Sequence, residues 1–156
     1  MTATNPTSFT ILLCTDGSEL AERALAAGLA VVAPADRVVV AIAIEPFDSS
    51  MVSGVSGFGG GTMTPEQYDT QRAAELAAAE EVLRETVTAL GLDGAETTVV
   101  EGDPANALCE LAASLPATVM VAGSRGRGGL KRALLGSVSD QLVRHAPCPI
   151  VITPPE

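Results

Sequence analysis

The sequence is poor in aromatic residues. They make up 3% of its 156 residues, and tryptophan is absent. The core must therefore be built from aliphatic side chains, and the chain lacks the stacking platform on which single-strand binders hold bases. The formal net charge of −10 disfavours partners with a negative surface, because phosphate backbones and acidic lipids would repel the chain. We therefore expect neither a nucleic-acid partner nor a membrane partner.

Cysteine is also scarce, and its spacing argues against a disulfide framework. The three cysteines, at positions 14, 109 and 148, are an odd number and contain no Cys-x-x-Cys pair. This pattern is typical of reduced thiols in a cytosolic protein. The N-terminus lacks the basic and apolar regions of a signal peptide, and no apolar run approaches the roughly 20 residues of a membrane span. We expect a cytoplasmic protein.

Histidine occurs once, as His145 near the end of a predicted helix. A structural zinc site needs several His or Cys ligands, and none cluster in this sequence. Neither a metal site nor a catalytic residue is therefore predicted.

What the chain does contain is enough apolar sequence for one packed domain. Hydrophobic residues make up 47% of it, and a chain of this length fits one domain better than two. Residues 1–8 are predicted to be a disordered tail, and residues 9–156 the folded domain. The continuous apolar runs at 9–15 and 37–44 are typical of parallel strands that are covered on both faces.

Strands and helices are predicted to alternate along the chain. Further strands are expected at 96–100, 117–122 and 149–153, and helices are expected to begin near Ser18, Pro65, Pro104 and Ser137. Such alternation indicates right-handed crossovers. We predict an α/β fold with a single open, parallel, five-stranded sheet in the order 3-2-1-4-5 and helices on both faces.

One segment departs from this regular pattern. Residues 45–64 are rich in Gly and Ser and show no periodicity. Loops of this length inside compact domains are often functional lids or are disordered. The sequence leaves both interpretations open.

The glycine-rich segment 123–137 carries the strongest functional signal. Five of its fifteen residues are glycine, and it holds four of the nine basic residues and no Asp or Glu. Glycines let backbone N–H groups approach an anion, and the helix that begins at Ser137 adds a favourable dipole. The segment therefore predicts a bound polyanion, although an ordinary solvated loop would also be basic.

The spacing of these glycines separates the common phosphate-binding motifs. There is no Walker A string, and Gly126-Arg-Gly128 lacks the third glycine of a dinucleotide fingerprint. The pattern that fits is glycine, two residues, glycine, nine residues, glycine and serine, satisfied by Gly123, Gly126, Gly136 and Ser137.

The stretch GSRGRGGLKRALLGSVSDQLVRHAPCPIVI resembles the ATP-binding signature of the universal stress proteins. The opening ILLCTDGSELAERAL, the segment GDPANAL and the closing PCPIVI are similar to that family as well. The resemblance extends from about Phe9 to Thr153. The excursion at 49–61 has no counterpart in the family pattern.

The resemblance implies a role for each residue of the glycine motif. Gly126, Gly136 and Ser137 would hold the phosphates through backbone N–H and hydroxyl groups. Gly123 and Ser124, at the end of the fourth strand, would shape the loop and approach the ribose or the phosphates.

The resemblance also implies residues outside this motif. Asp16 would lie near the ribose and adenine, the backbone of Ala43 would meet the adenine, and Gly102 would line the ribose side. Arg127, from the basic cluster, completes the predicted binding residues. Without the resemblance, the alternative for Asp16 is that it is only a turn former ahead of a helix. Asp103 is better explained as a helix cap than as a ligand contact.

The implied function is that of an ATP-binding universal stress protein, with ATP, with or without Mg²⁺, as a regulatory or structural ligand. No general base or paired carboxylates for Mg²⁺ stand out, so we expect at most slow hydrolysis. The apolar last strand would form a homodimer, as the resemblance implies and as an exposed sheet edge permits. The alternatives are a nucleotide-independent dimeric scaffold or interaction module, and a weak ATPase.

Overall fold

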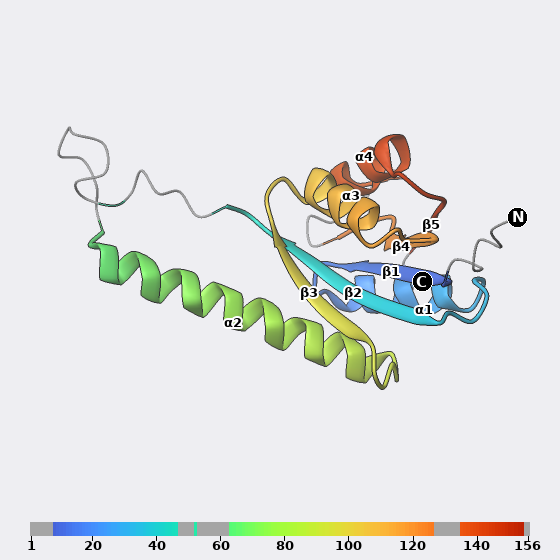
Figure 1. Ribbon diagram of the computed structural model, residues 1–156, viewed down its shortest axis with the longest axis horizontal. Coiled ribbons are helices and arrows are strands. Elements are labelled where there is room, and N and C mark those ends of the chain that lie inside the picture. Colours follow the sequence, from blue (N-terminus) through green and yellow to red (C-terminus); the bar gives the residue numbers. More distant parts are fainter. Residues whose placement is uncertain (1–7, 47–51, 53–62, 127–134, 155–156) are drawn as a thin grey trace, which may run out of the picture.

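A single parallel sheet forms the centre of the protein, in a computed structural model that describes residues 8–46, 52, 63–126 and 135–154 (Figure 1). Its strand order is β3-β2-β1-β4-β5, which confirms the predicted fold. The elements in chain order are β1 (Thr10–Thr15), α1 (Glu19–Leu29), β2 (Arg37–Ile44), α2 (Pro65–Ala89), β3 (Glu96–Glu101), α3 (Pro104–Ser114), β4 (Val119–Gly123), α4 (Ser137–His145) and β5 (Ile150–Thr153).

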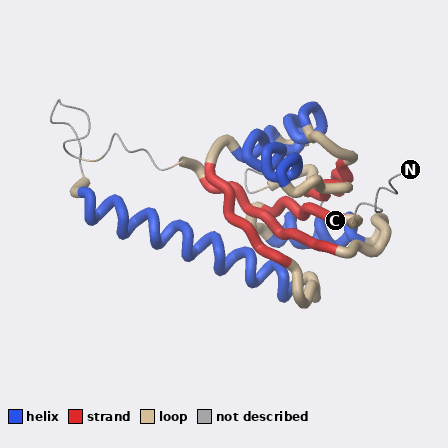
Figure 2. Tube along the Cα trace, in the orientation of Figure 1, coloured by secondary structure: helices blue, strands red, loops and turns tan. Residues whose placement is uncertain are grey.

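Helices cover both faces of the sheet (Figure 2): α3 and α4 pack on one face, and α1 and α2 on the other. Every residue of the central strand β1 is buried. Leu12 and Cys14 belong to the core beneath α3 and α4, whereas Ile11 and Leu13 belong to the core above α1 and α2. The continuous apolar run of β1 therefore serves both faces, as expected for a doubly covered parallel strand.

Helix α1 lies unusually close to the sheet. A Cβ atom built on Gly28 would fall 2.3 Å from Cγ1 of Val121 in β4. The hydroxyl of Thr153 in β5 donates a 2.5 Å hydrogen bond to the carbonyl of Ala24. Glycine at position 28 is therefore required by the packing of α1 against β4.

Helix α2 is longer than the sheet that it covers, and its first half extends beyond the sheet (Figure 1). A capping box between Thr64 and Gln67 begins it. Its buried residues all lie in the second half: Ala79, Leu83 and Thr86. The first half is tied back by an ion pair between Arg72 and Glu101, at the end of β3.

The long excursion predicted between the second strand and α2 falls mostly outside the described residues, as does the predicted tail up to residue 7. Val52 is described; it is buried and forms an isolated bridge with Met63. None of the helices in the described part of the chain has the length and apolar composition of a membrane span.

Candidate functional site

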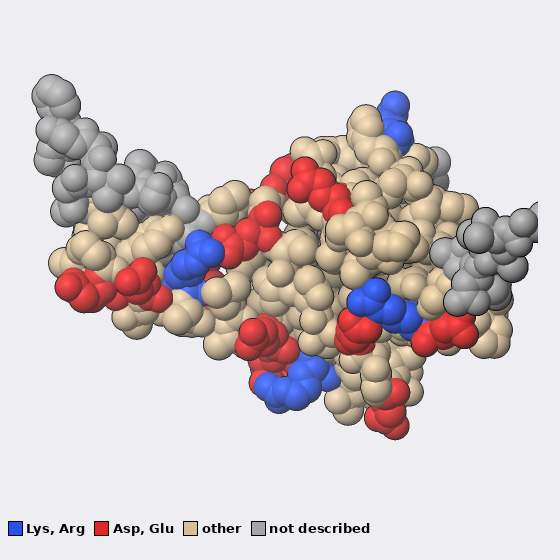
Figure 3. Space-filling model, viewed as in Figure 1, with Lys and Arg blue, Asp and Glu red and all other residues tan. Residues whose placement is uncertain are grey.

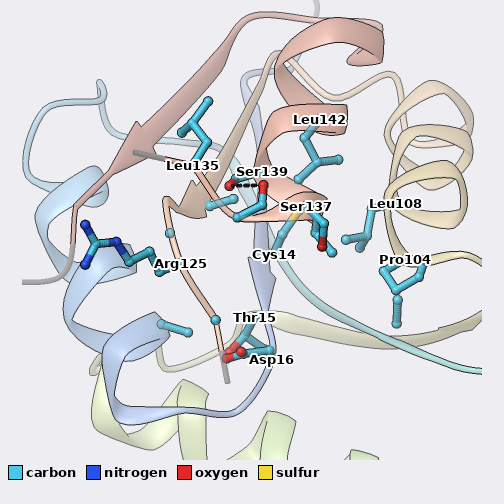
Figure 4. A pocket seen from close by; sticks show the side chains of 17 residues that line it. Cys14, Thr15, Asp16, Pro104, Leu108, Arg125, Leu135, Ser137, Ser139 and Leu142 are labelled. Carbon is cyan, nitrogen blue, oxygen red and sulfur yellow. Dashed lines mark hydrogen bonds between the residues drawn. The ribbon is translucent and has the colours of Figure 1, made fainter. Parts of the chain in front are cut away.

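A cavity of about 350 Å³ opens at the carboxyl ends of β1, β2 and β4. This is the edge at which open α/β sheets bind their ligands, and the chain reverses its direction of winding between β1 and β4. Figure 4 shows the lining side chains. The lining residues come from the strand ends, from α3 and from the start of α4: Cys14, Thr15, Asp16, Ala21, Ala43, Pro104, Leu108, Ala122, Gly123, Arg125, Gly126, Leu135, Gly136, Ser137, Val138, Ser139 and Leu142.

A tight turn after β1 places Asp16 in the wall of this cavity. Gly17 has a φ of 76°, a left-handed conformation that glycine adopts without strain. Oδ1 of Asp16 accepts hydrogen bonds from the backbone N–H of Ser18 at 3.0 Å and from its hydroxyl at 2.6 Å. Asp16 is thus both a turn former and a cavity residue, and the two interpretations of the sequence are compatible.

The glycine-rich loop passes directly over this carboxylate. A Cβ atom on Gly126 would lie 2.4 Å from Oδ2 of Asp16, so any side chain at 126 would displace that carboxylate. The two loops, more than a hundred residues apart in sequence, meet because β1 and β4 are neighbours.

The start of α4 forms another part of the wall. Its N-cap is Gly136, which provides no side-chain hydrogen bond to the helix, and Ser137 is exposed to the cavity. A Cβ at Gly136 would make only ordinary contacts, the nearest at 3.5 Å from the carbonyl oxygen of Ser124. The fold therefore does not require glycine at this position. First-turn N–H groups of this kind favour an anion.

Ser124 anchors both ends of the glycine-rich loop through its backbone. Its carbonyl accepts from the N–H of Gly136 at 2.7 Å and from the hydroxyl of Ser139 at 2.9 Å. Its own N–H donates to the carbonyl of Thr153 in β5 at 2.8 Å. Ser139 also donates to the carbonyl of Gly136 at 3.0 Å (Figure 4). Loop, α4 and β5 are thus joined at the backbone of one residue, Ser124.

The inner end of the cavity is apolar. It is lined by Cys14, Leu108, Ala122 and Leu142, all of them buried. Burial raises the pKa of the Cys14 thiol to about 12, so this thiol is neutral at physiological pH. Such a surface fits a flat, weakly polar group better than a phosphate.

One basic side chain of the loop is described. The guanidinium group of Arg125 points away from the cavity (Figure 4), and its Nε is buried with no hydrogen-bond partner among the described residues, as is the hydroxyl of Ser124. The predicted binding residue Arg127 lies outside the described residues, together with Lys131 and Arg132.

The structure brings most of the predicted binding residues together. The cavity is lined by Asp16, Ala43, Gly123, Gly126, Gly136 and Ser137. Gly102 and Ser124 are not part of this lining: Gly102 forms the turn after β3 with a φ of 138°, and Ser124 acts through its backbone.

Sequence reasoning missed the apolar inner end and Ser139. Cys14, Leu108 and Leu142 lie on buried faces of regular elements. The sequence of a buried face does not show whether a cavity adjoins it. Thr15 could have been found, because it ends a strand beside Asp16. Within the described ranges, no group of three or more His, Cys, Asp or Glu side chains is arranged to hold a metal ion.

Comparisons with known proteins identify the family of the chain and the solved structures that share its fold. The model of the Universal stress protein family matches residues 8–154. A universal stress protein of Thermus aquaticus, encoded in the QAH/OAS sulfhydrylase 3′ region, is 33% identical over 144 residues, covering 92% of this chain and 96% of the relative.

Two solved structures share the fold at lower identity. A universal stress protein in complex with cAMP has a TM-score of 0.60 and 23% identity, covering 96% of this chain and 98% of its own. A universal stress protein family protein from Arabidopsis thaliana with AMP bound has a TM-score of 0.55 and 17% identity, covering 95% of this chain and 92% of its own.

Proposed function

The chain belongs to the universal stress protein family, and we propose that it binds ATP, with or without Mg²⁺, as a regulatory or structural ligand in a stress response. One observation carries the proposal: the uncapped first turn of α4 and the carboxylate of Asp16 line a single cavity with an apolar inner end. A nucleotide has the matching parts, because its phosphates suit the helix terminus, its hydroxyls suit the carboxylate and its base suits the apolar end.

The glycines support a ligand that approaches the backbone closely. The fold does not require glycine at 136, because a Cβ there would meet only ordinary contacts. A phosphate bound beside the N–H groups of α4 would require it. The neighbours with bound cAMP and AMP support adenine as the base. We extend this to ATP because of the basic loop, which carries four of the nine basic residues within eight positions.

Slow turnover at most is part of the proposal. Among the described lining residues, Asp16 is the one carboxylate, and its Oδ1 is engaged by Ser18. Neither a second carboxylate for Mg²⁺ nor a histidine accompanies it in this lining. The nucleotide is therefore proposed as a regulatory or structural ligand and not as a substrate in fast turnover.

The test is calorimetric titration of ATP into nucleotide-free protein, with Ser137→Asp compared with the isosteric Ser137→Asn. A carboxylate in the first turn of α4 favours the helix dipole, so the fold is preserved, but the negative charge repels a phosphate. We expect Ser137→Asp to bind ATP about 100-fold more weakly and Ser137→Asn to stay within about tenfold of the wild type.

Adenosine, which carries no phosphate, provides the matched ligand. Its affinity is expected to be the same in both variants. Equal ATP affinities in the two variants would mean that the phosphates do not bind at the start of α4. No binding of ATP, AMP or cAMP by the wild-type protein would favour the nucleotide-independent scaffold instead.

We further propose a homodimer formed through β5. This strand lies at the edge of the sheet, and Ile150, Val151 and Ile152 are only half-buried. An apolar edge of this kind pairs readily with a second chain. The cytoplasmic location stays a prediction from composition.

A further inference from the structure

The carboxylate of Asp16 is held by a helix cap. Ser18 is the N-cap of α1, and its hydroxyl oxygen accepts a hydrogen bond from the N–H of Ala21 at 3.1 Å. The same hydroxyl donates to Oδ1 of Asp16 at 2.6 Å, and the N–H of Ser18 donates to the same oxygen at 3.0 Å.

This double use fixes the direction of the hydroxyl proton. A serine hydroxyl has one proton to donate, and the bond from Ala21 leaves that proton to Asp16. The carboxylate therefore receives two hydrogen bonds from one capping residue on one side. On its other side, Oδ2 lies against Gly126, where a Cβ would approach to 2.4 Å. Asp16 is confined between α1 and the glycine-rich loop.

The chemistry of a carboxylate restricts what it can meet in this cavity. An ionised carboxylate accepts hydrogen bonds and donates none, and it repels phosphates. In a bound nucleotide the available donors are the ribose hydroxyls and the amino group of the base. Because Asp16 lies beside Gly126, and not at the apolar end formed by Leu108 and Leu142, the ribose is the group that it would face.

We propose that Ser18 is a positioning residue, which fixes Asp16 as the acceptor for a ribose hydroxyl and thereby sets the preference for ribonucleotides over deoxyribonucleotides. The inference rests on the proposed nucleotide function. It adds to that function a residue that lies outside the cavity lining and touches the ligand only through Asp16.

The experiment measures a ratio of affinities. ATP, 2′-deoxy-ATP and 3′-deoxy-ATP are titrated into the wild-type protein and into Ser18→Ala. The discrimination is defined as the affinity for ATP divided by the affinity for the weaker-binding of the two deoxynucleotides. A hydrogen bond to a fixed carboxylate predicts a discrimination of about tenfold or more in the wild type. In Ser18→Ala we expect it to fall below about threefold, because the shorter of the two bonds from residue 18 to Oδ1, the 2.6 Å bond from the hydroxyl, is lost and only the 3.0 Å bond from the backbone N–H remains.

Controls separate positioning from stability. Asp103 caps α3 with a bond from the N–H of Asn106 at 3.1 Å, so Asp103→Ala loses a comparable cap and is expected to keep the wild-type discrimination. Ser18→Thr retains a hydroxyl and is expected to restore it. Ser18→Gly keeps a residue that is accepted at N-caps and replaces Ser18→Ala if that variant fails to fold.

The possible failures are distinguishable. If the wild-type protein binds ATP but Ser18→Ala or Ser18→Gly discriminates as well as the wild type, the positioning role of Ser18 is overturned and the nucleotide function stands. If the wild type binds ATP and both deoxynucleotides equally, Asp16 does not face the ribose, and the inference is likewise wrong. If no nucleotide binds, the proposed function and this inference fail together.

Discussion

At the scale of single residues, burial of the cysteines has a larger effect than the ion pairs of the surface. In each described ion pair, both side chains are partly exposed to solvent, and exposed pairs contribute little to stability. Cys14, in contrast, is buried, and its pKa is raised to about 12, first by burial and then by the neighbouring Cys109 and Cys148. Burial also raises the pKa of these two thiols.

The raised pKa of Cys14 makes stability depend on pH in the alkaline range. The folded protein keeps a proton that the unfolded chain, with an ordinary thiol pKa near 9.0, has lost. The contribution is therefore complete below about pH 9 and declines as the pH rises toward about 12. We expect the free energy of unfolding to fall with a slope of roughly 1 kcal/mol per pH unit from this group alone.

Urea unfolding of the wild type and Cys14→Ala between pH 8 and pH 11 measures this contribution. The alanine variant is less stable at pH 8, because a buried side chain has been shortened, but the difference between the two proteins should shrink as the pH rises. A difference that stays constant over this range would mean that Cys14 titrates normally.

At the scale of elements, α1 shows how a glycine can be required inside a helix. Alanine is a better helix former than glycine by about 1 kcal/mol, yet a methyl group at position 28 would overlap Val121. We expect Gly28→Ala to destabilise the protein by about 1–3 kcal/mol, because overpacking outweighs propensity. Urea denaturation gives the value.

A second variant distinguishes overlap from other causes. In a Val121→Ala background the overlapping methyl groups are absent, so Gly28→Ala should become neutral or stabilising. Additive effects of the two substitutions would contradict the packing described for α1 and β4.

Element boundaries could be predicted closely, because each is set by local chemistry. The apolar run 37–44 became β2 with the same limits, and the Asp103-Pro104 pair became the cap and first residue of α3 as predicted. The fourth strand begins two residues later than predicted, since Ala117 is still bonded to the carbonyl of Ala112 at the end of α3.

What could not be predicted depends on contacts between elements. The stripe through Leu76, Ala79 and Leu83 predicts one inward face for α2, but Leu76 is only half-buried, whereas Ala79 and Leu83 are buried. Thr86 is fully buried because its hydroxyl bonds to the carbonyl of Val82. Periodicity describes the face of a helix and carries no information on how far the opposing surface extends.

At the scale of the whole molecule, the candidate site depends on the order of the strands. Asp16 and Gly126 meet only if β1 and β4 are neighbours, and the predicted order 3-2-1-4-5 is what placed both in one site. The apolar inner end was not predicted, because side chains from four separate elements, β1, α3, β4 and α4, form it together.

Charge and the edge strand both bear on the proposed homodimer. On the face shown in Figure 3, acidic side chains are widely spread and most basic ones lie beside them, in keeping with the net charge of −10. The carbonyls of Pro149 and Thr153 face β4, so the backbone groups of Ile152 turn to the free edge, since neighbouring residues of a strand alternate.

We therefore expect Ile152→Pro, which removes one outward N–H, to shift the protein to monomer by at least about tenfold in dissociation constant. Ile152→Val keeps this N–H and should remain dimeric in sedimentation velocity. Higher salt should strengthen the dimer, because it screens the repulsion between two acidic subunits. A wild-type protein that is monomeric at all accessible concentrations would refute association through β5.

The backbone bonds of Ser124 have a consequence for how this protein can change over evolution. Because the carbonyl of Ser124 closes the glycine-rich loop onto Gly136 and Ser139 while its N–H continues the sheet into β5, the ends of the loop are fixed by two bonds between backbone atoms and by the hydroxyl of Ser139. Substitutions between these ends leave the anchoring bonds in place. Ligand preference can thus diverge among descendants of this sequence while the sheet is inherited intact.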